Sequence, residues 1–461
     1  MVTTAESKTR QPWVSTANPC HQCRPLGATV AFQGIQGCVP FLHGSQGCAT
    51  YMRRYLISHF REPVDIASSS VSEKEAVWGG GPALRQGLRN VTEKYGAKVV
   101  GVATTCLTET TGEDMGMLLH EWRKDIATNP LAVAEPDVVS VPCPSYDGTH
   151  MDGFHGAVRA LTQHFAQKCA PHGGIALFPG FVSPADLRHL REIQAAFGLH
   201  GTLVPDYADR LDGPALAEAG PLPEGGTTVE AMRALPGCKA SIEFGRTISD
   251  KLSGAAFLES EWNVPRRTLG MPIGIRESDA FFAAMEELSG RETPADWQHE
   301  RGRLIDACVD AHKYLAGRTA VVFGDEDLAI GLVAFLTEIG IKTTLVVSGG
   351  KSGKLKDGIE RVTRSFLEEM PRILADADFR DMEECAESQM ADLFIGHSKG
   401  YKLARRRDVP LVRVGFPLHD RFGGQRQLHV GWRGALGLLD NIVNTILEKR
   451  QDDSPVGYSY L

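Results

Sequence analysis

Three cysteines in widely separated segments constrain this chain more than any other feature. Cys23, Cys48 and Cys106 lie much too far apart for a zinc finger and do not follow the spacing of a linear ferredoxin motif. Their segments, HQCRPLGA, HGSQGC and ATTCLTE, are rich in glycine or threonine. Thiolates are soft metal ligands, and small neighbours let the backbone approach a bulky inorganic group. We therefore predict that these three cysteines bind an iron–sulfur cluster.

The other cysteines fit this interpretation less well. A single cysteine is more often a buried structural thiol than a ligand, and only the joint pattern of the three favours ligation. Cys20 forms a C-x-x-C with Cys23, which could indicate zinc, but a tetrahedral site needs two further ligands at similar spacing. Cys20 stays a weaker candidate for contact with the cluster. We expect the remaining six to be packing residues: Cys38, Cys143, Cys169, Cys238, Cys308 and Cys385.

Length and charge narrow the class of protein. A chain of 461 residues is too long for one core and suggests two to four domains. A net charge of −8 argues against a nucleic-acid partner. Neither an apolar signal segment near the N-terminus nor a run of 18 apolar residues occurs, so we expect a cytoplasmic protein without a membrane partner. In a reducing cytosol, ten cysteines are expected to be thiols or metal ligands rather than disulfides.

The pattern along the chain alternates strand, loop and helix. Lys98 to Thr105 reads as a buried parallel strand with Cys106 directly at its carboxyl end, where open α/β sheets place their ligands. Thr319 to Phe323 and Thr343 to Val347 flank a helical pattern, which makes a β-α-β unit. Further predicted elements are a strand at 174–178, a helix that begins at Ser183 and Pro184, strands at 392–395 and 410–414, and a C-terminal helix from about 433 to 450.

This alternation predicts parallel sheets covered by helices, in about three Rossmann-like domains. A break at the Cys169 to Gly174 stretch and a polar segment at 289–298 suggest where the domains meet. The predicted ranges are 1–170 for an N-terminal cluster-binding domain, 171–315 for a middle domain and 316–461 for a C-terminal domain with its terminal helix.

Ordered motifs along nearly the whole chain resemble the β subunit of the nitrogenase component-1 family. The resemblance implies the fold just described and a [8Fe-7S] P-cluster-type cluster, bound by Cys23, Cys48 and Cys106 and shared with an α subunit. It also implies an α2β2 assembly, an active-site metal cofactor in α, and a separate ATP-dependent [4Fe-4S] reductase. The motifs are C-x-P-L-G-A, H-G-S-Q-G-C, T-T-C-x-x-E with Gly112-Glu113-Asp114, F-R-E-P at 60–63, S-S-S-V with A-V-W-G-G at 68–80, P-I-G-I-R-x-S-D at 272–279, E-R-G-R-L-I-D at 300–306, G-H-S-K-G at 396–400 and G-F-P-x-x-D-R at 415–421.

The same resemblance implies roles for three further residues. Ser145 aligns with a serine that binds one iron of the oxidised cluster, which suits a hard alkoxide ligand, although the neighbouring Asp147-Gly148-Thr149 departs from the family pattern. Tyr51 aligns with a position between the two metal clusters and is a candidate electron relay. Trp78 replaces a phenylalanine that faces the docking reductase. The alternatives are a serine that caps a turn, an ordinary helix aromatic and a core tryptophan.

A cation site between two β subunits is also implied. Arg61 and Glu62, with Asp306 and Asp310, match a divalent-cation site of the family. The two aspartates are four residues apart, so their carboxylates share a helix face and need a cation or a basic partner. Solvated surface charge is the alternative.

The motif signature bears on the reaction. Gly349-Gly350-Lys351-Ser352 lacks the earlier glycine of a phosphate-binding loop, so we expect no ATP hydrolysis by this chain. Three features are similar to the nitrogenase-like methylthio-alkane reductase: the short segment before Cys23, G-S-Q-G-C in place of G-G-Q-G-C, and the terminal SPVGYSYL. This resemblance implies C–S bond reduction for sulfur acquisition. Dinitrogen reduction is the alternative, followed by a scaffold for cofactor assembly, whose subunit of this type has a single interface cysteine, and by reductases of the protochlorophyllide type.

Overall fold

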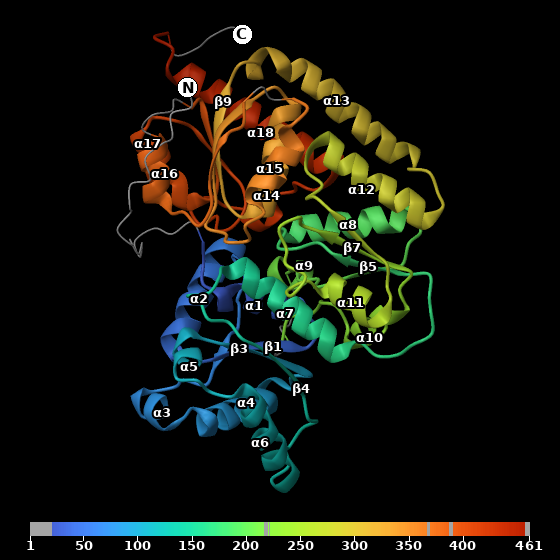
Figure 1. Cartoon of the computed structure of the whole chain (residues 1–461), viewed down its shortest axis with the longest axis vertical. Helices are drawn as coiled ribbons and strands as arrows, with labels where there is room; N and C mark the ends of the chain where they lie inside the picture. Colours follow the sequence, from blue (N-terminus) through green and yellow to red (C-terminus); the bar gives the residue numbers. More distant parts are fainter. Residues whose placement is uncertain (1–20, 216–219, 221, 367–368, 387–390, 457–461) are drawn as a thin grey trace, which may run out of the picture.

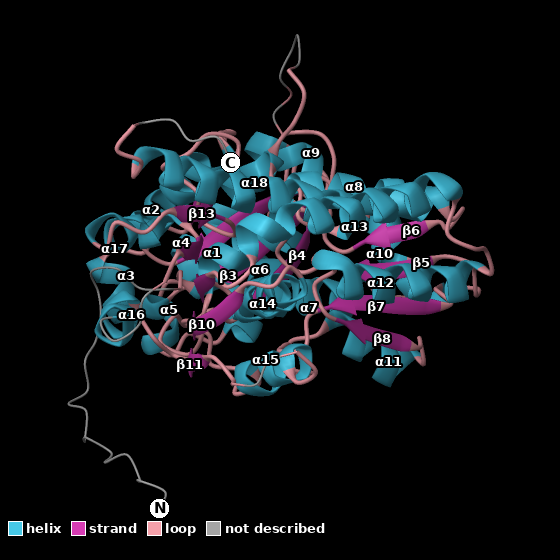
Figure 2. Ribbon diagram, turned by 90° about the horizontal axis from the view of Figure 1, so that it is seen from above, coloured by secondary structure: helices cyan, strands magenta, loops and turns pink. Residues whose placement is uncertain are grey.

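Parallel sheets covered by helices form the architecture, as the sequence predicts. The computed structural model describes residues 21–215, 220, 222–366, 369–386, 391–456, and within them it has three sheets (Figure 1). Every strand pair in them is parallel. Figure 2 shows helices above and below the strands. Parallel strands need long crossover connections, and helices that cover both faces supply them.

The strands fall into three groups in chain order. The first sheet has the order β2 (Ala67–Ser68), β1 (Cys38–His43), β3 (Val99–Thr104), β4 (Asp137–Val141). The second has the order β6 (Gly201–Leu203), β5 (Ile175–Phe178), β7 (Ala240–Phe244), β8 (Arg266–Leu269). The third has the order β11 (Arg372–Leu374), β10 (Lys342–Val347), β9 (Thr319–Phe323), β12 (Leu393–Gly396), β13 (Leu411–Arg413).

The helices connect these strands. Those up to the first strand of the second sheet are α1 (Arg24–Gln33), α2 (Gln46–Phe60), α3 (Glu73–Trp78), α4 (Gly81–Tyr95), α5 (Cys106–Thr110), α6 (Met115–Thr128) and α7 (His150–Phe165). The next are α8 (Pro184–Ala196), α9 (Ala208–Leu211), α10 (Val229–Arg233), α11 (Gly254–Trp262), α12 (Gly274–Ser289) and α13 (Ala295–Leu315). The last are α14 (Glu326–Glu338), α15 (Leu355–Thr363), α16 (Phe379–Ala386), α17 (Tyr401–Arg406) and α18 (Gly431–Asp452), with short 3-10 turns at Leu235–Gly237, Ser398–Gly400 and Gly424–Arg426.

Each sheet lies within one of the predicted domain ranges, yet packing is continuous across them. One hydrophobic cluster extends from Leu26 to Ile446 and joins elements of all three sheets. The C-terminal helix α18 packs against α12 and α13, which belong to the middle range. The division at 170 and 315 therefore stays a prediction.

Five of the six cysteines expected to be packing residues do pack, and Cys169 does not. Cys38, Cys143, Cys238 and Cys385 are buried, Cys308 is half-buried and packs against the main hydrophobic cluster, and Cys169 is exposed. Cys169 follows the end of α7 on a loop, and Cys308 lies on α13, a helix with few buried residues. For Cys169 the expectation was wrong, because a loop after a helix end does not provide a core environment. Cys20 lies outside the described residues.

Candidate functional site

Three neighbouring strands of the first sheet deliver side chains to one edge. Cys106 is the first residue of α5, directly after β3, and Cys48 lies in the first turn of α2, after β1. Ser145 lies in the loop after β4. The sheet order places β1, β3 and β4 side by side, and their carboxyl ends meet at the same edge. We call Cys23, Cys48, Cys106 and Ser145 the cysteine edge.

Cys23 reaches this edge by another route, because it precedes α1 rather than following a strand. The neighbouring Gln22 donates its backbone N–H to His150 Nδ1 at 3.3 Å and accepts the backbone N–H of His150 at 3.0 Å. His150 Nε2 in turn lies 3.4 Å from Asp325 Oδ1, which belongs to the third sheet's first loop. The Cys23 loop is thus held by the start of α7 and by a carboxylate from another sheet.

Direct contacts join the members of the cysteine edge. The backbone N–H of Ser145 donates to Cys106 Sγ at 3.2 Å, and Ser145 Oγ accepts the backbone N–H of Arg24 at 3.2 Å. Partial burial raises the pKa of the Cys23 thiol; a hydrogen bond from the Ser145 hydroxyl opposes this, and the Cys106 and Cys48 thiols add to it. The structure therefore brings together the three predicted cysteines and Ser145.

The donor set fits an iron–sulfur cluster. Cys23 and Cys106 are exposed and Cys48 is half-buried, whereas Cys38 and Cys143 of the same sheet are buried. Three thiolates are one fewer than the four that hold a common iron–sulfur cluster. Among the described residues, no three His, Cys, Asp or Glu side chains are grouped to hold a single metal ion. Soft donors at or near the surface thus suit an iron–sulfur cluster rather than a lone cation.

Tyr51 lies one turn after Cys48 on α2 and is 50% exposed. Its hydroxyl donates to the Tyr55 hydroxyl at 3.0 Å, and the two ring centroids are 4.8 Å apart. Lys399 Nζ lies 5.4 Å from the centroid of the Tyr55 ring. Tyr51 is therefore part of an aromatic pair beside the cysteine edge, and its relay role stays a prediction.

Trp78 ends α3 with its side chain in solvent. The residue is 82% exposed and the preceding Val77 is 75% exposed, so neither packs in the core of this chain. Figures 1 and 2 show α3 at the periphery of the first sheet, close to α5. An exposed apolar pair next to the helix of Cys106 is the type of surface that a protein partner covers.

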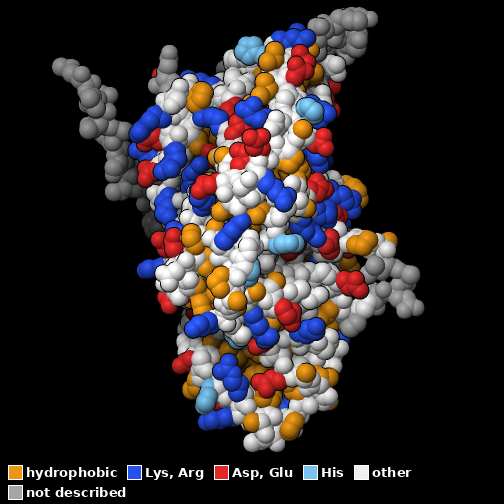
Figure 3. All heavy atoms as spheres, turned by 90° about the vertical axis from the view of Figure 1, so that its right-hand side faces the viewer, with side chains coloured by type: hydrophobic (Ala, Val, Ile, Leu, Met, Phe, Trp, Pro, Cys, Tyr) orange, Lys and Arg blue, Asp and Glu red, His pale blue; other side chains and the backbone are white. Residues whose placement is uncertain are grey.

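The four residues of the expected cation site do not meet within one chain. Arg61 follows α2 in the left-handed conformation, with φ of 61°. The pKa of the neighbouring Glu62 is raised, mainly by partial burial and further by the negative charge of Asp212. Asp306 and Asp310 are exposed on α13, which lies in a different part of the chain from α2 (Figure 1). α13 is on the side shown in Figure 3, where acidic and basic side chains are interspersed. A cation site from these residues needs two copies of the chain and stays a prediction.

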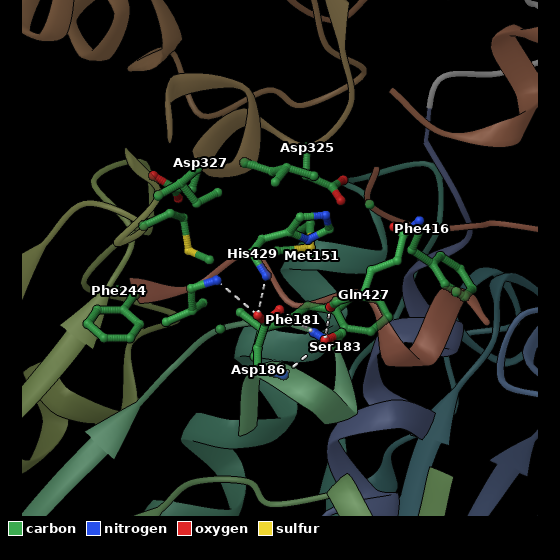
Figure 4. Close-up of a pocket in the computed structure, with 18 of the residues that line it drawn as sticks. Met151, Phe181, Ser183, Asp186, Phe244, Asp325, Asp327, Phe416, Gln427 and His429 are labelled. Atoms are coloured by element: carbon green, nitrogen blue, oxygen red, sulfur yellow. Dashed lines mark hydrogen bonds between the residues drawn. The ribbon is translucent and has the colours of Figure 1, made fainter. Parts of the chain in front are cut away.

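A small cavity lies where loops of the second and third sheets meet α2 and α7 (Figure 4). Its volume is about 60 Å³, and Asp186 in its wall accepts the backbone N–H groups of His429 and Val430 at 2.8 and 3.0 Å. Burial lowers the pKa of His155 to about 4, so this imidazole is neutral near pH 7. Such a space holds about four waters at roughly 15 Å³ each. It is much smaller than the roughly 300 Å³ of a usual ligand pocket.

Fold and site together define an α/β protein of parallel sheets with three accessible or half-buried thiols gathered at one sheet edge. The family model described as "Nitrogenase component 1 type Oxidoreductase" matches residues 23–447. The chain belongs to this nitrogenase component 1 family.

The relatives include beta chains of different nitrogenases. The nitrogenase molybdenum-iron protein beta chain of Clostridium pasteurianum is 35% identical over 433 residues, 94% of this chain and 93% of that protein. The nitrogenase iron-iron protein beta chain of Rhodobacter capsulatus is 33% identical over 437 residues, 94% of each. A solved structure, "Nitrogenase Cp1 at pH 6.5", matches with a TM-score of 0.92 at 33% identity and covers 98% of both chains. This chain is therefore a nitrogenase-like β-type subunit of an oxidoreductase family.

None of the described helices combines the length and apolar character that a membrane span requires.

Proposed function

We propose that the chain is the β subunit of a nitrogenase-like reductase. It binds one half of a [8Fe-7S] P-cluster-type cluster and passes electrons from an ATP-dependent [4Fe-4S] reductase to an active-site cofactor in the α subunit. The observation that carries this proposal is the cysteine edge: three thiols from three separate segments, two exposed and one half-buried, together with Ser145, in a member of this family. The bound cluster supplies one-electron redox chemistry.

The residues of this chain set the geometry around that group. Cys23, Cys48 and Cys106 supply thiolates, and Ser145 supplies a hydroxyl that is already within reach of Cys23. Tyr51, one turn after Cys48 on α2, is the proposed electron relay. No side chain of this subunit acts as acid or base on the substrate; its part is ligation, distance and dielectric.

For the substrate we propose methylthio-alkanes, reduced with C–S bond cleavage for sulfur acquisition. The G-S-Q-G-C segment around Cys48 supports this, because the resemblance given above distinguishes it from G-G-Q-G-C. Identities of 35% and 33% to molybdenum-iron and iron-iron beta chains favour neither type clearly. The names of these relatives support dinitrogen reduction as the second candidate. A scaffold for cofactor assembly fits less well, since all three cysteines are present.

The test uses the purified α/β complex with its reductase, ATP and dithionite. Iron analysis with EPR, on complex whose α chain lacks its own cofactor, should give about eight irons per αβ pair. A pure four-iron signal would reject the cluster assignment. With the complete complex, methanethiol from dimethyl sulfide or 2-methylthioethanol should form faster than ammonia from dinitrogen. Gas chromatography of the thiol and an ammonia assay on one preparation decide it, and faster ammonia formation would favour the second candidate.

Replacing Trp78 by alanine should weaken reductase docking. The side chain is 82% exposed, and an aromatic anchor at a hot spot typically contributes about 2 kcal/mol or more, which is roughly a 30-fold change in affinity. We expect a higher reductase concentration at half-maximal activity with an unchanged cluster spectrum. Phe422→Ala, at a 78% exposed aromatic in the third domain range, is the control. Loss of the cluster in Trp78→Ala would instead assign the residue a structural role.

Replacing Asp306 and Asp310 together by asparagine should weaken the α2β2 assembly and leave the cluster content unchanged. The two exposed carboxylates need a cation to approach a second subunit. Mass photometry across a chelator titration measures this, and Asp440→Asn with Glu448→Gln removes the same charge from the exposed face of α18 as a control. A tetramer that persists at low concentration would identify the two aspartates as ordinary surface charge.

A further inference from the structure

A carboxylate links the end of α3 to the interior of the first sheet. We call residues 78–80, from the last residue of α3 to the start of α4, the Trp78 loop. Glu113 Oε1 accepts the backbone N–H of Gly80 at 2.8 Å, and Glu113 Oε2 accepts Nε2–H of His43 at 2.7 Å. The His43 side chain is fully buried and that of Glu113 is 9% exposed. Because a carboxylate only accepts, the proton on His43 lies on Nε2. We call Gly80, Glu113 and His43 the Glu113 bridge.

The inner end of the bridge touches the loops of two cysteines. His43 is the last residue of β1 and begins the H-G-S-Q-G-C segment that contains Cys48. The carbonyl of His43 accepts the hydroxyl of Thr108 at 2.9 Å, and Thr108 lies in α5, the helix that begins with Cys106. The backbone N–H of Glu113 donates to the Thr108 carbonyl at 3.1 Å, which fixes the bridge to the same helix a second time.

Packing around the bridge leaves little room for a shift in one part alone. A Cβ on Gly80 would lie 2.7 Å from Glu113 Oε1 and 3.0 Å from His43 Cε1. A Cβ on Gly44 would lie 2.0 Å from Thr105 Oγ1, so the two cysteine loops cross in close contact. Close-packed interiors of this kind transmit displacement rather than absorb it. A buried carboxylate is also costly to separate from its hydrogen-bond donors.

We propose that Glu113 is a positioning residue that couples the Trp78 loop to the Cys48 and Cys106 loops through His43. When a protein partner covers Trp78, the shift at Gly80 moves the carboxylate, the imidazole and the start of α5 together. The coupling rests on the proposed function, in which that partner is the reductase. In this proposal, Glu113 and His43 transmit the effect of reductase docking at Trp78 to the loops that contain Cys48 and Cys106.

The experiment is hydrogen–deuterium exchange of the α/β complex, alone and with the reductase held by MgADP and aluminium fluoride. Docking should slow exchange at residues 77–81 and change it at least twofold at residues 43–48 and 104–112. No change at 77–81 would contradict docking at Trp78 and with it this part of the proposed function. Protection at 77–81 without any response at 43–48 or 104–112 would overturn the coupling alone.

Two substitutions separate the bridge from a general effect of charge. Glu113→Ala should abolish the response at 43–48 and 104–112 while protection at 77–81 persists. Glu113→Gln should retain it, because glutamine can accept from Gly80 and donate to the other tautomer of His43. Glu135→Ala, at an exposed loop position of the same sheet, is the control. An intact response at 43–48 and 104–112 in Glu113→Ala would overturn the coupling through Glu113. Equal loss of that response in both Glu113 variants would also overturn it. If Glu113→Ala does not fold, the exchange pattern of the native complex and that of Glu113→Gln decide the question.

Discussion

Replacing Cys48 by alanine is expected to remove or truncate the interface cluster and to abolish turnover. Cys48 is the half-buried member of the cysteine edge, and Ser45 Oγ donates to its sulfur at 3.5 Å. An iron that loses this thiolate has only water or a hydroxyl to replace it, and both are harder ligands than sulfur. Iron analysis and EPR of the purified complex should show the loss before any activity is measured.

The control for Cys48→Ala is Cys169→Ala. Cys169 is an exposed thiol, but it lies on the loop after α7, far along the chain from Cys48, which is half-buried. Its replacement should leave the iron content, the EPR spectrum and the rate at the native level. A Cys48→Ala complex with a full complement of iron and native turnover would contradict the assignment of the cysteine edge as the cluster site.

Much of the fold could be predicted because buried parallel strands have a plain signature. The run at 98–105 corresponds to β3 (Val99–Thr104), and Cys106 follows its carboxyl end as predicted, with Thr105 between them. The β-α-β unit at 319–347 is confirmed by β9, α14 and β10, with boundaries that differ by one residue. β1 is harder to recognise, because its sequence, CVPFLH, contains a proline and a histidine within a fully buried strand.

The candidate site was predictable only in part. Cys48, Cys106 and Ser145 follow neighbouring strands, so the α/β rule explains why they meet. The route of Cys23 depends on His150 and Asp325, which lie far from it in the sequence. No local pattern reveals such tertiary contacts.

The partners of Glu113 were missed for the same reason. Glu113 and His43 both stand in the recognised motifs, yet no periodicity indicates that they meet or that Gly80 joins them. The cation site could not be tested for a different reason: it would form between two subunits, and such a contact does not appear in the packing of a single chain.

The close crossing of α1 and α7 explains how Cys23 keeps its position. A Cβ on Gly27 of α1 would lie 1.6 Å from the carbonyl oxygen of His150, and a Cβ on Gly153 of α7 would lie 1.9 Å from the carbonyl oxygen of Arg24. The two helices thus meet backbone to backbone through a reciprocal pair of glycines. The three atoms nearest to a Cβ at Gly27 all belong to the backbone of α7, so no side chain can move aside there and a methyl group at position 27 must push the helices apart.

We therefore expect Gly27→Ala to destabilise the chain by about 3 kcal/mol or more, at the upper end of overpacking effects. This outweighs the gain of up to about 1 kcal/mol that alanine gives in a helix. Gly437→Ala in α18 is the matched control, since its Cβ meets nothing within 4 Å and only the helix preference changes. Thermal unfolding should show a lower midpoint for Gly27→Ala and an equal or higher one for Gly437→Ala. Cys23 immediately precedes α1, so the iron content should fall in Gly27→Ala and not in Gly437→Ala. Native stability with a full iron content in Gly27→Ala would mean that the two helices can separate without moving Cys23.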